Sequence, residues 1–297
     1  MVSKIYEEAD SFVLSVRWIS NILIVIALPF QCMLIRVLWK NRKISEYTSP
    51  FYLTVQINCF LNVLQTLAKL FVDVPATSDA FRESYAENAN IVGKLINFRG
   101  FYISMIIVSN LAYITINRLA VILHVDTYRK KPVLRSTIKK LFSIWLFWSI
   151  LCLPIVWPIE YRAVRLDAID YDYQIISSQR FFQKVYVMSS IVHTFSVLIL
   201  TYVAYIIIGI QLYKKKNAVL KKRVLNVTLA ALLMSLGMIL CIGIVAADFI
   251  ASRFGYYFLT QNYYQMVFNL GIDFNVFITP ISVIALTTDV RKRLFAS

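Results

Sequence analysis

The chain has 297 residues, of which 59% are hydrophobic and only 16% are charged. A soluble domain is nearer half apolar and about a quarter charged. This composition excludes an ordinary soluble protein and favours a chain that has lipid as its solvent. The formal net charge of +15 leaves nucleic acid as a possible partner until the positions of the charges are considered.

Several segments of the chain are long and apolar enough to cross a bilayer, which takes about 20 mostly apolar residues in a helix. They are residues 18–38, 50–72, 97–123, 141–159, 184–210, 224–250 and 263–286. Short polar loops lie between them, without a long linker or a repeat. The sequence therefore predicts an all-α membrane protein, a seven-transmembrane helix bundle in a single domain over residues 1–297.

The two ends of the chain are predicted to lie outside the bundle of residues 18–286, with 1–17 as an extracellular tail and 287–297 as a cytoplasmic tail. Residues 1–17 lack the basic start and the cleavage site of a secretory signal peptide, which favours a first span that is retained as an anchor. Prolines also fall within the predicted spans, where membrane helices tolerate kinks. They are Pro29, Pro154, Pro158 and Pro280.

The second span is the least apolar of the seven. Its polar and charged residues are Gln56, Asn58, Asn62, Gln65 and Lys69. Polar side chains at such depth usually face other helices rather than lipid.

Basic residues gather on one side of the predicted membrane. The side of the carboxyl terminus holds 19 Lys and Arg residues and the opposite side 7, whereas acidic residues are split 3 to 11. Because basic loops stay in the cytoplasm, we expect a multi-pass plasma-membrane protein with its amino terminus outside and its carboxyl terminus inside. Basic clusters that flank spans attract anionic lipid, so the charge indicates the lipid bilayer as partner and no nucleic acid.

The cysteines and histidines indicate no metal or cofactor site. Cys32, Cys59, Cys152 and Cys241 all fall in predicted spans, so no loop disulfide is expected. His193 and His124 have no metal-ligand spacing. No hydrolase triad, His-Glu-x-x-His or glycine-rich phosphate motif is present, which argues against an enzyme.

Short motifs at the span ends identify a family. The second span opens with Ser49-Pro50-Phe51-Tyr52, the third ends with Asn117-Arg118-Leu119, and the seventh holds Asp273-Phe274-Asn275 and Thr279-Pro280 before a short basic tail. Together with the hydropathy of nearly the whole chain, these motifs resemble the nematode serpentine chemoreceptors, most closely the class gamma and class V groups. The resemblance implies a rhodopsin-like G-protein-coupled receptor architecture. Asn117 and Thr279 depart from the broader rhodopsin-like motifs, which puts the standard activation mechanism in doubt.

Arg118 is the main candidate for G-protein contact. The resemblance implies that an Arg at the inner end of the third helix meets the carboxyl end of a G-protein α subunit. Its alternative role is positive-inside anchoring, in which the guanidinium snorkels to the interface. Lys214, Lys222 and Arg223 flank the third inner loop and are candidates for the same surface, with lipid anchoring as the alternative.

Asp273 is the deepest predicted charge, about ten residues into the seventh span. Asn58 and Asn62 are its expected partners, whereas Lys69 is placed near the outer surface and is not favoured. With Pro280 these residues form a predicted switch network, and direct ligand or cation binding by Asp273 is the alternative.

A cavity between the outer halves of the third, fifth, sixth and seventh helices is predicted to bind a small-molecule ligand. His193 is a further candidate, with packing as its alternative role. The other lining candidates are Tyr102, Met105, Val187, Phe195, Ile244, Asp248, Gln265 and Asn269.

The predicted function is therefore a G-protein-coupled chemosensory receptor that signals to a heterotrimeric G protein. The alternative is a small-solute transporter or channel, although such a protein would more typically carry several deep ionisable groups. A retinal protein would need a Lys within residues 263–286, and none is present.

Overall fold

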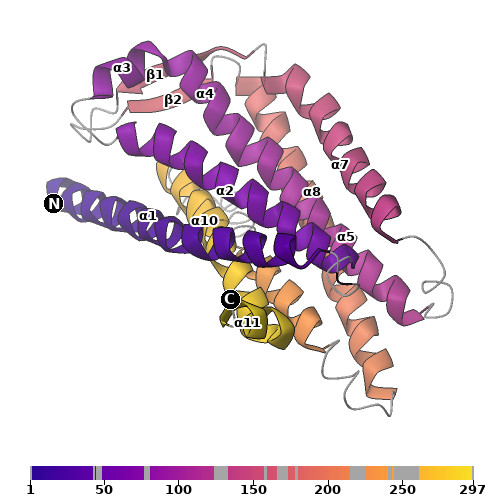
Figure 1. Ribbon diagram of the computed structural model, residues 1–297. Coiled ribbons are helices and arrows are strands. Elements are labelled where there is room, and N and C mark those ends of the chain that lie inside the picture. Colours follow the sequence, from indigo (N-terminus) through magenta and orange to yellow (C-terminus); the bar gives the residue numbers. More distant parts are fainter. Residues whose placement is uncertain are drawn as a thin grey trace.

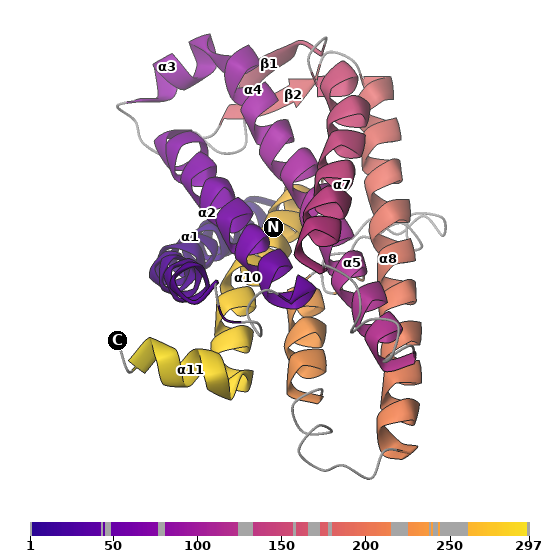
Figure 2. The same ribbon diagram turned by 45° about the vertical axis from the view of Figure 1, so that its right-hand side comes forward.

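The computed structural model describes residues 2–42, 44, 49–76, 81–123, 133–156, 159–165, 173–177, 180–214, 225–237, 239, 243 and 261–295. Long helices dominate these residues, as Figures 1 and 2 show. The longest are α1 (Val2–Lys40), α2 (Pro50–Ala76), α5 (Ser104–Leu123), α7 (Val133–Val156), α8 (Arg180–Lys214) and α10 (Gln261–Leu286).

The third and sixth predicted spans have less regular helices. In the third, α4 (Ala89–Asn97) continues through the π-helix η2 (Phe98–Ile103) into α5. In the sixth, the described residues form the shorter helix Leu225–Gly237. Among the described residues, each predicted span contains a helix, in agreement with the all-α class. α1, α2 and α8 extend beyond their predicted spans because a helix does not have to end where the hydrocarbon core ends.

The amino-terminal segment belongs to the first helix. α1 begins at Val2, so most of residues 1–17, predicted as a tail, continue the helix. At the other end, α11 (Thr288–Phe295) turns by 91° from α10 and packs against the bundle through Val290 and Leu294.

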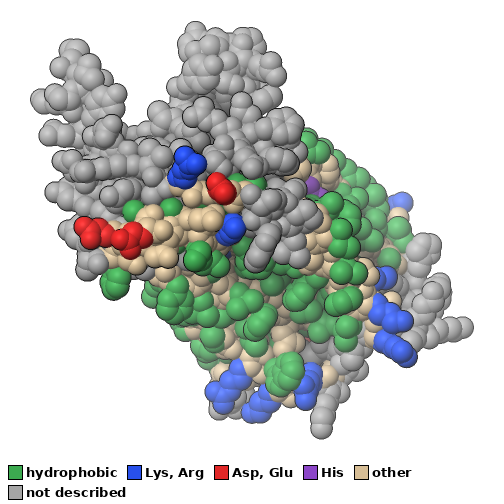
Figure 3. Space-filling model, turned by 90° about the horizontal axis from the view of Figure 1, so that it is seen from above, with side chains coloured by type: hydrophobic (Ala, Val, Ile, Leu, Met, Phe, Trp, Pro, Cys, Tyr) green, Lys and Arg blue, Asp and Glu red, His purple; other side chains and the backbone are tan. Residues whose placement is uncertain are grey.

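The outward surfaces of the helices are apolar. Trp18, Phe142 and Val192 are each 60% or more exposed, and Figure 3 shows hydrophobic side chains over much of the described surface with Lys and Arg near its margins. Within the described residues, Trp18–Lys40, Ala89–Leu123 and Ile191–Lys214 are long and apolar enough to cross a membrane, and Leu270–Leu286 with Thr288–Phe295 adds a fourth if this bent pair is one span. Lipid is the environment that such a surface requires.

One end of the bundle carries a β-hairpin that the sequence did not predict. Strands β1 (Tyr161–Arg165) and β2 (Tyr173–Ser177) pair antiparallel beside α4 and the short helix α3 (Arg82–Glu87), at the end opposite α11 (Figure 1). A Cβ on Gly93 of α4 would lie 2.3 Å from Cγ of Tyr161. The absence of a side chain at Gly93 therefore allows the hairpin to lie directly on α4.

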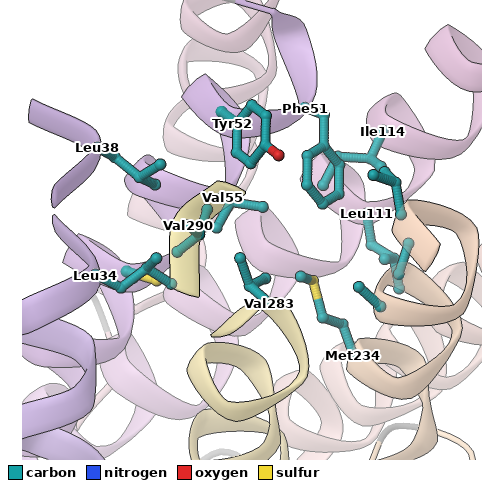
Figure 4. Close-up of a cluster of buried hydrophobic side chains, with 14 of the residues drawn as sticks. Leu34, Leu38, Phe51, Tyr52, Val55, Leu111, Ile114, Met234, Val283 and Val290 are labelled. Atoms are coloured by element: carbon teal, nitrogen blue, oxygen red, sulfur yellow. The ribbon is translucent and has the colours of Figure 1, made fainter. Parts of the chain in front are cut away.

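The core is divided between the two ends of the bundle. The larger cluster of buried side chains, shown in part in Figure 4, joins α1, α2, α5, α8, α10, α11 and the helix Leu225–Gly237. Its labelled members include Leu34, Val55, Leu111, Met234 and Val283. The second cluster lies around η2 and α7 and includes Phe101, Ile106 and Trp148. Polar side chains occupy positions on the helices between these clusters.

Candidate functional site

Asp273 lies in a polar cluster that joins α1, α2 and α10. The residue is 4% exposed. Its carboxylate forms an ion pair with Lys69 of α2 and accepts a hydrogen bond from Ser20 of α1. The Lys69 ammonium also donates to the Ser20 hydroxyl at 2.5 Å. We refer to Ser20, Lys69 and Asp273 as the ionic cluster.

The ionic cluster corrects the sequence-based expectation for Asp273, which favoured Asn58 and Asn62 and placed Lys69 near the outer surface. α2 continues to Ala76, so Lys69 lies about two turns inside the end of its helix. Its flexible stem carries the ammonium onto Asp273 instead of out to the interface. Burial favours this ion pair, because an unpaired charge at this depth would cost several kcal/mol.

Arg99 adds a second buried cation near the ionic cluster. It belongs to η2, is 5% exposed and acts electrostatically on Asp273. Lys69 and Arg99 are thus two buried cations that act electrostatically on the buried Asp273 carboxylate. Arg99 was not among the residues predicted from the sequence, although an Arg only two residues into a predicted span was a signal for it.

The two predicted switch asparagines do not reach Asp273. The Asn58 side-chain oxygen accepts a hydrogen bond of 2.7 Å from the Asn110 amide of α5. Asn62 is fully buried, and neither its oxygen nor its nitrogen has a hydrogen-bond partner in the part of the chain that is described. Asn58 therefore connects α2 to α5, and the connection from α2 to α10 runs through Lys69.

Pro280 creates a second link between α1 and α10. A proline within a helix has no N–H for the carbonyl four residues earlier, which here belongs to Val276. The Gln31 side chain of α1 donates to that carbonyl at 2.6 Å. The sequence predicted a kink at Pro280 but missed Gln31, whose place in an apolar run was the available signal.

His193 of α8 is connected to α5 and α7. Its Nε2 lies 3.1 Å from the Ser109 hydroxyl, which accepts a 2.8 Å hydrogen bond from the Trp148 indole. The Trp148 and His193 rings meet edge to face with centroids 4.8 Å apart. These contacts agree with the packing role that was the alternative for His193.

The remaining ligand candidates have different surroundings. The Tyr102 hydroxyl lies 2.7 Å from that of Ser149 on α7, and Met105 is buried in the second core cluster. Gln265 and Asn269 belong to α10, but only their backbone is described, and Asp248 falls outside the described residues.

Toward the carboxyl end of α5, Arg118 contacts the start of α2. Its guanidinium carbon lies 4.8 Å from the centroid of the Phe51 ring, a cation–π arrangement. Asn117 beside it is buried, 5% exposed. Lys214 is exposed in the last turn of α8, whereas Lys222 and Arg223 fall outside the described residues. Two of the motifs that indicated a family, Ser49-Pro50-Phe51-Tyr52 and Asn117-Arg118-Leu119, therefore meet in space.

The comparison with protein families agrees with this arrangement. A model described as serpentine type 7TM GPCR chemoreceptor Srv matches residues 21–297, which is nearly the whole chain. The chain belongs to the Srv chemoreceptor family. A comparison with curated proteins gives no match.

Membership in the Srv family confirms the resemblance to serpentine chemoreceptors. It makes the protein a multi-pass membrane protein of a receptor family and not an enzyme. The described side chains also hold no group of three or more His, Cys, Asp or Glu residues arranged to bind a metal ion. Polar contacts link the helices of this Srv chemoreceptor at three places: the ionic cluster, the contact from Gln31 to Val276, and the contact between Arg118 and Phe51.

Proposed function

We propose that this Srv chemoreceptor binds a small ligand among the outer halves of its helices and signals to a heterotrimeric G protein at its inner end. In this proposal the protein lies in the plasma membrane with its amino terminus outside and its carboxyl terminus in the cytoplasm. The whole chain acts as one receptor domain.

The observation that carries the proposal is the ion pair between Lys69 and Asp273. A receptor needs an element with two arrangements whose balance a ligand can shift. This pair ties α2 to α10 and lies about two turns from the end of α2. An outer ligand that separates the pair would release α10, within which Pro280 leaves the Val276 carbonyl without its helical N–H partner.

The proposed ligand cavity keeps the lining residues that the sequence indicated. Asp248, Gln265 and Asn269 would face a ligand from the sixth and seventh helices, and His193 would face it from α8. Tyr102 and Met105 pack toward α7, so their role would be to shape the cavity wall.

The inner surface would receive the G protein. Arg118 stands at the inner end of α5 over Phe51, and Lys214 extends from the last turn of α8. With Lys222 and Arg223 these residues would form a basic surface. In the switch network, the released α10 would act on that surface through Pro280, and the released α2 would act on α5 through the Asn58 contact with Asn110.

Signalling in a heterologous cell tests the proposal. The receptor is expressed with a promiscuous G protein and exposed to volatile and water-soluble chemicals, with calcium as the readout. A chemical that raises calcium only in cells with both receptor and G protein supports the proposal. Receptor present at the surface with no response to any chemical contradicts it.

A small-solute transporter is the second candidate, and one observation favours it. The structure shows Lys69 paired with Asp273 and buries Arg99 as a further ionisable group, and deep ionisable groups are typical of transport pathways. Solute uptake or current in cells without the added G protein would support this alternative. The same cells therefore distinguish the two functions.

A further inference from the structure

A contact between the end of α1 and α11 brings basic side chains from distant parts of the sequence together. The Arg293 guanidinium of α11 donates a hydrogen bond of 2.9 Å to the side-chain oxygen of Asn41, which follows the last residue of α1. Exposed cations lie close to both partners of this contact in the sequence. They are Lys40 and Arg42 near Asn41, and Arg291 and Lys292 near Arg293, and we refer to these four residues as the basic patch.

The basic patch lies where two apolar helical segments end. The segment Trp18–Lys40 is long and apolar enough to cross a membrane, and its last residue is the first of the patch. α10 ends at Leu286, and α11 turns by 91° from the direction of Leu270–Leu286, so that it runs across the end of the bundle (Figure 2). A helix perpendicular to a span lies along the membrane surface. The patch is therefore at the level of the lipid headgroups.

Exposed aromatic rings accompany the basic patch. Trp39 is 59% exposed and Phe295 is 77% exposed. Val290 and Leu294 place one face of α11 against the bundle, and Phe295 stands one helical turn from Arg291 on another face. Aromatic side chains favour the interface between membrane and water. Cations and exposed rings together suit a lipid, which has a charged headgroup and an apolar part, better than a soluble anion, which has no apolar part.

The two arginines of the patch are held in place by neighbouring groups. The guanidinium carbon of Arg42 lies 4.3 Å from the centroid of the Trp39 ring. Stacking on a ring leaves the N–H groups in the guanidinium plane able to donate. Arg291 donates one N–H to the Ala285 carbonyl at 3.2 Å, which leaves its other N–H groups for a further acceptor. Both side chains can therefore bind phosphate oxygens, which match the fork of an arginine.

We propose that the basic patch binds the headgroup of a phosphoinositide, an anionic lipid that carries more than one phosphate group. A headgroup with a single charge pairs with the cations of α1 or with those of α11, whereas several phosphates pair with both at once. The bound lipid thereby joins α11 to α1. Anionic lipids concentrate in the cytoplasmic leaflet, which the patch faces in the orientation of the proposed function. The lipid is a partner in addition to the small ligand and the G protein.

Native mass spectrometry of the purified receptor in detergent, without ligand or G protein, tests the site. The probes are a short-chain phosphatidylinositol bisphosphate, a short-chain phosphatidylserine, and inositol trisphosphate as the soluble headgroup. We expect saturable binding of the bisphosphate lipid at concentrations where neither of the other two is retained. Equal retention of phosphatidylserine would reduce the effect to general charge attraction, and equal retention of inositol trisphosphate would remove the need for a lipid. Either result overturns the proposal.

Paired variants separate the patch from the net charge of the receptor. Arg42→Gln with Lys292→Gln removes one cation from each segment and should raise the dissociation constant of the bisphosphate lipid at least about tenfold. Arg135→Gln with Lys139→Gln removes two exposed cations of α7 and is the matched control, for which no change is expected. Equal losses in the two double variants, or no loss in either, would contradict the patch.

Trp39→Leu tests whether the patch is a built site. It leaves every charge in place but removes the ring on which Arg42 stacks. The dissociation constant of the bisphosphate lipid should rise about threefold, the loss expected for one exposed cation–π contact. Unchanged binding would overturn the ordered site and leave only a charged surface.

The G protein is the rival partner for basic side chains at this end of the bundle. Loss of signalling in the Arg42 and Lys292 double variant, with lipid binding unchanged, would assign the patch to the G protein and overturn the lipid site. Lipid binding that this variant abolishes, in a receptor that responds to no chemical, would leave the lipid site standing and overturn only the proposed receptor function.

Discussion

At the scale of single residues, the buried ion pair between Lys69 and Asp273 has a measurable stability signature. Lys69→Met or Asp273→Leu alone leaves a buried charge without its partner and should lower the free energy of unfolding by about 3–5 kcal/mol. The double variant replaces both charges by apolar groups and should regain most of that loss. Unfolding in nanodiscs gives all three values. Additive losses would show that the two residues do not interact.

Arg118 allows a second prediction at the same scale. Arg118→Ala should abolish ligand-evoked signalling and leave surface expression intact, because its guanidinium, at the inner end of α5, is proposed to contact the G protein. Arg135→Ala removes an exposed cation near the inner end of α7 and is the control. Calcium imaging and surface labelling measure the two effects. Unchanged signalling in the Arg118 variant would leave membrane anchoring as its role.

The sequence predicted the position of some polar residues but not their contacts. Depth along a span identified Asp273 as a deep charge, because depth follows from position in the helix alone. Its partner did not follow, since a lysine stem can extend toward either end of its helix. Gln31 was missed for a similar reason: its bond to the Val276 carbonyl depends on α1 lying beside α10, which no local pattern shows.

At the scale of helices, Gly237 fixes how closely two of them approach. A Cβ there would lie 2.7 Å from the Gly271 carbonyl oxygen and 2.9 Å from the Asn275 nitrogen, both backbone atoms of α10. Gly237→Ala should therefore force the helices apart and cost about 1–3 kcal/mol.

Gly209 provides the control for that prediction. It lies within α8, and a Cβ there would meet nothing within 4 Å. Gly209→Ala should stabilise the protein by about 0.5–1 kcal/mol through helix propensity. Thermal unfolding of both variants measures the difference, and equal shifts would contradict the close approach at Gly237.

The helices themselves were predictable, and their irregularities were not. Each long apolar run contains a helix in the part of the chain that the structure describes, since the bilayer imposes one length and one composition on each span. The π-helix η2 and the hairpin of β1 and β2 depend on packing against α2, α4 and α7, so the sequence analysis gave no sign of them.

At the scale of the whole molecule, the distribution of charge predicts its direction in the membrane. With 19 basic residues on one side and 7 on the other, the amino terminus should face the outside. An epitope tag before Met1 should bind antibody on intact cells, and a tag after Ser297 only after permeabilisation. The reverse pattern would place Arg118 outside and contradict both the orientation and the proposed G-protein contact.

The ionic cluster also has a consequence for biosynthesis. Lys69 leaves the ribosome 204 residues before Asp273, which at 5–20 residues per second is a delay of about 10–40 s. During that delay α2 carries a charge and a row of amides that lipid does not accept. Until α10 is synthesised, the insertion machinery or α1 must therefore bind the polar side of the nascent α2. A chain cut short before α10 should accordingly be degraded and not accumulate as a partial bundle.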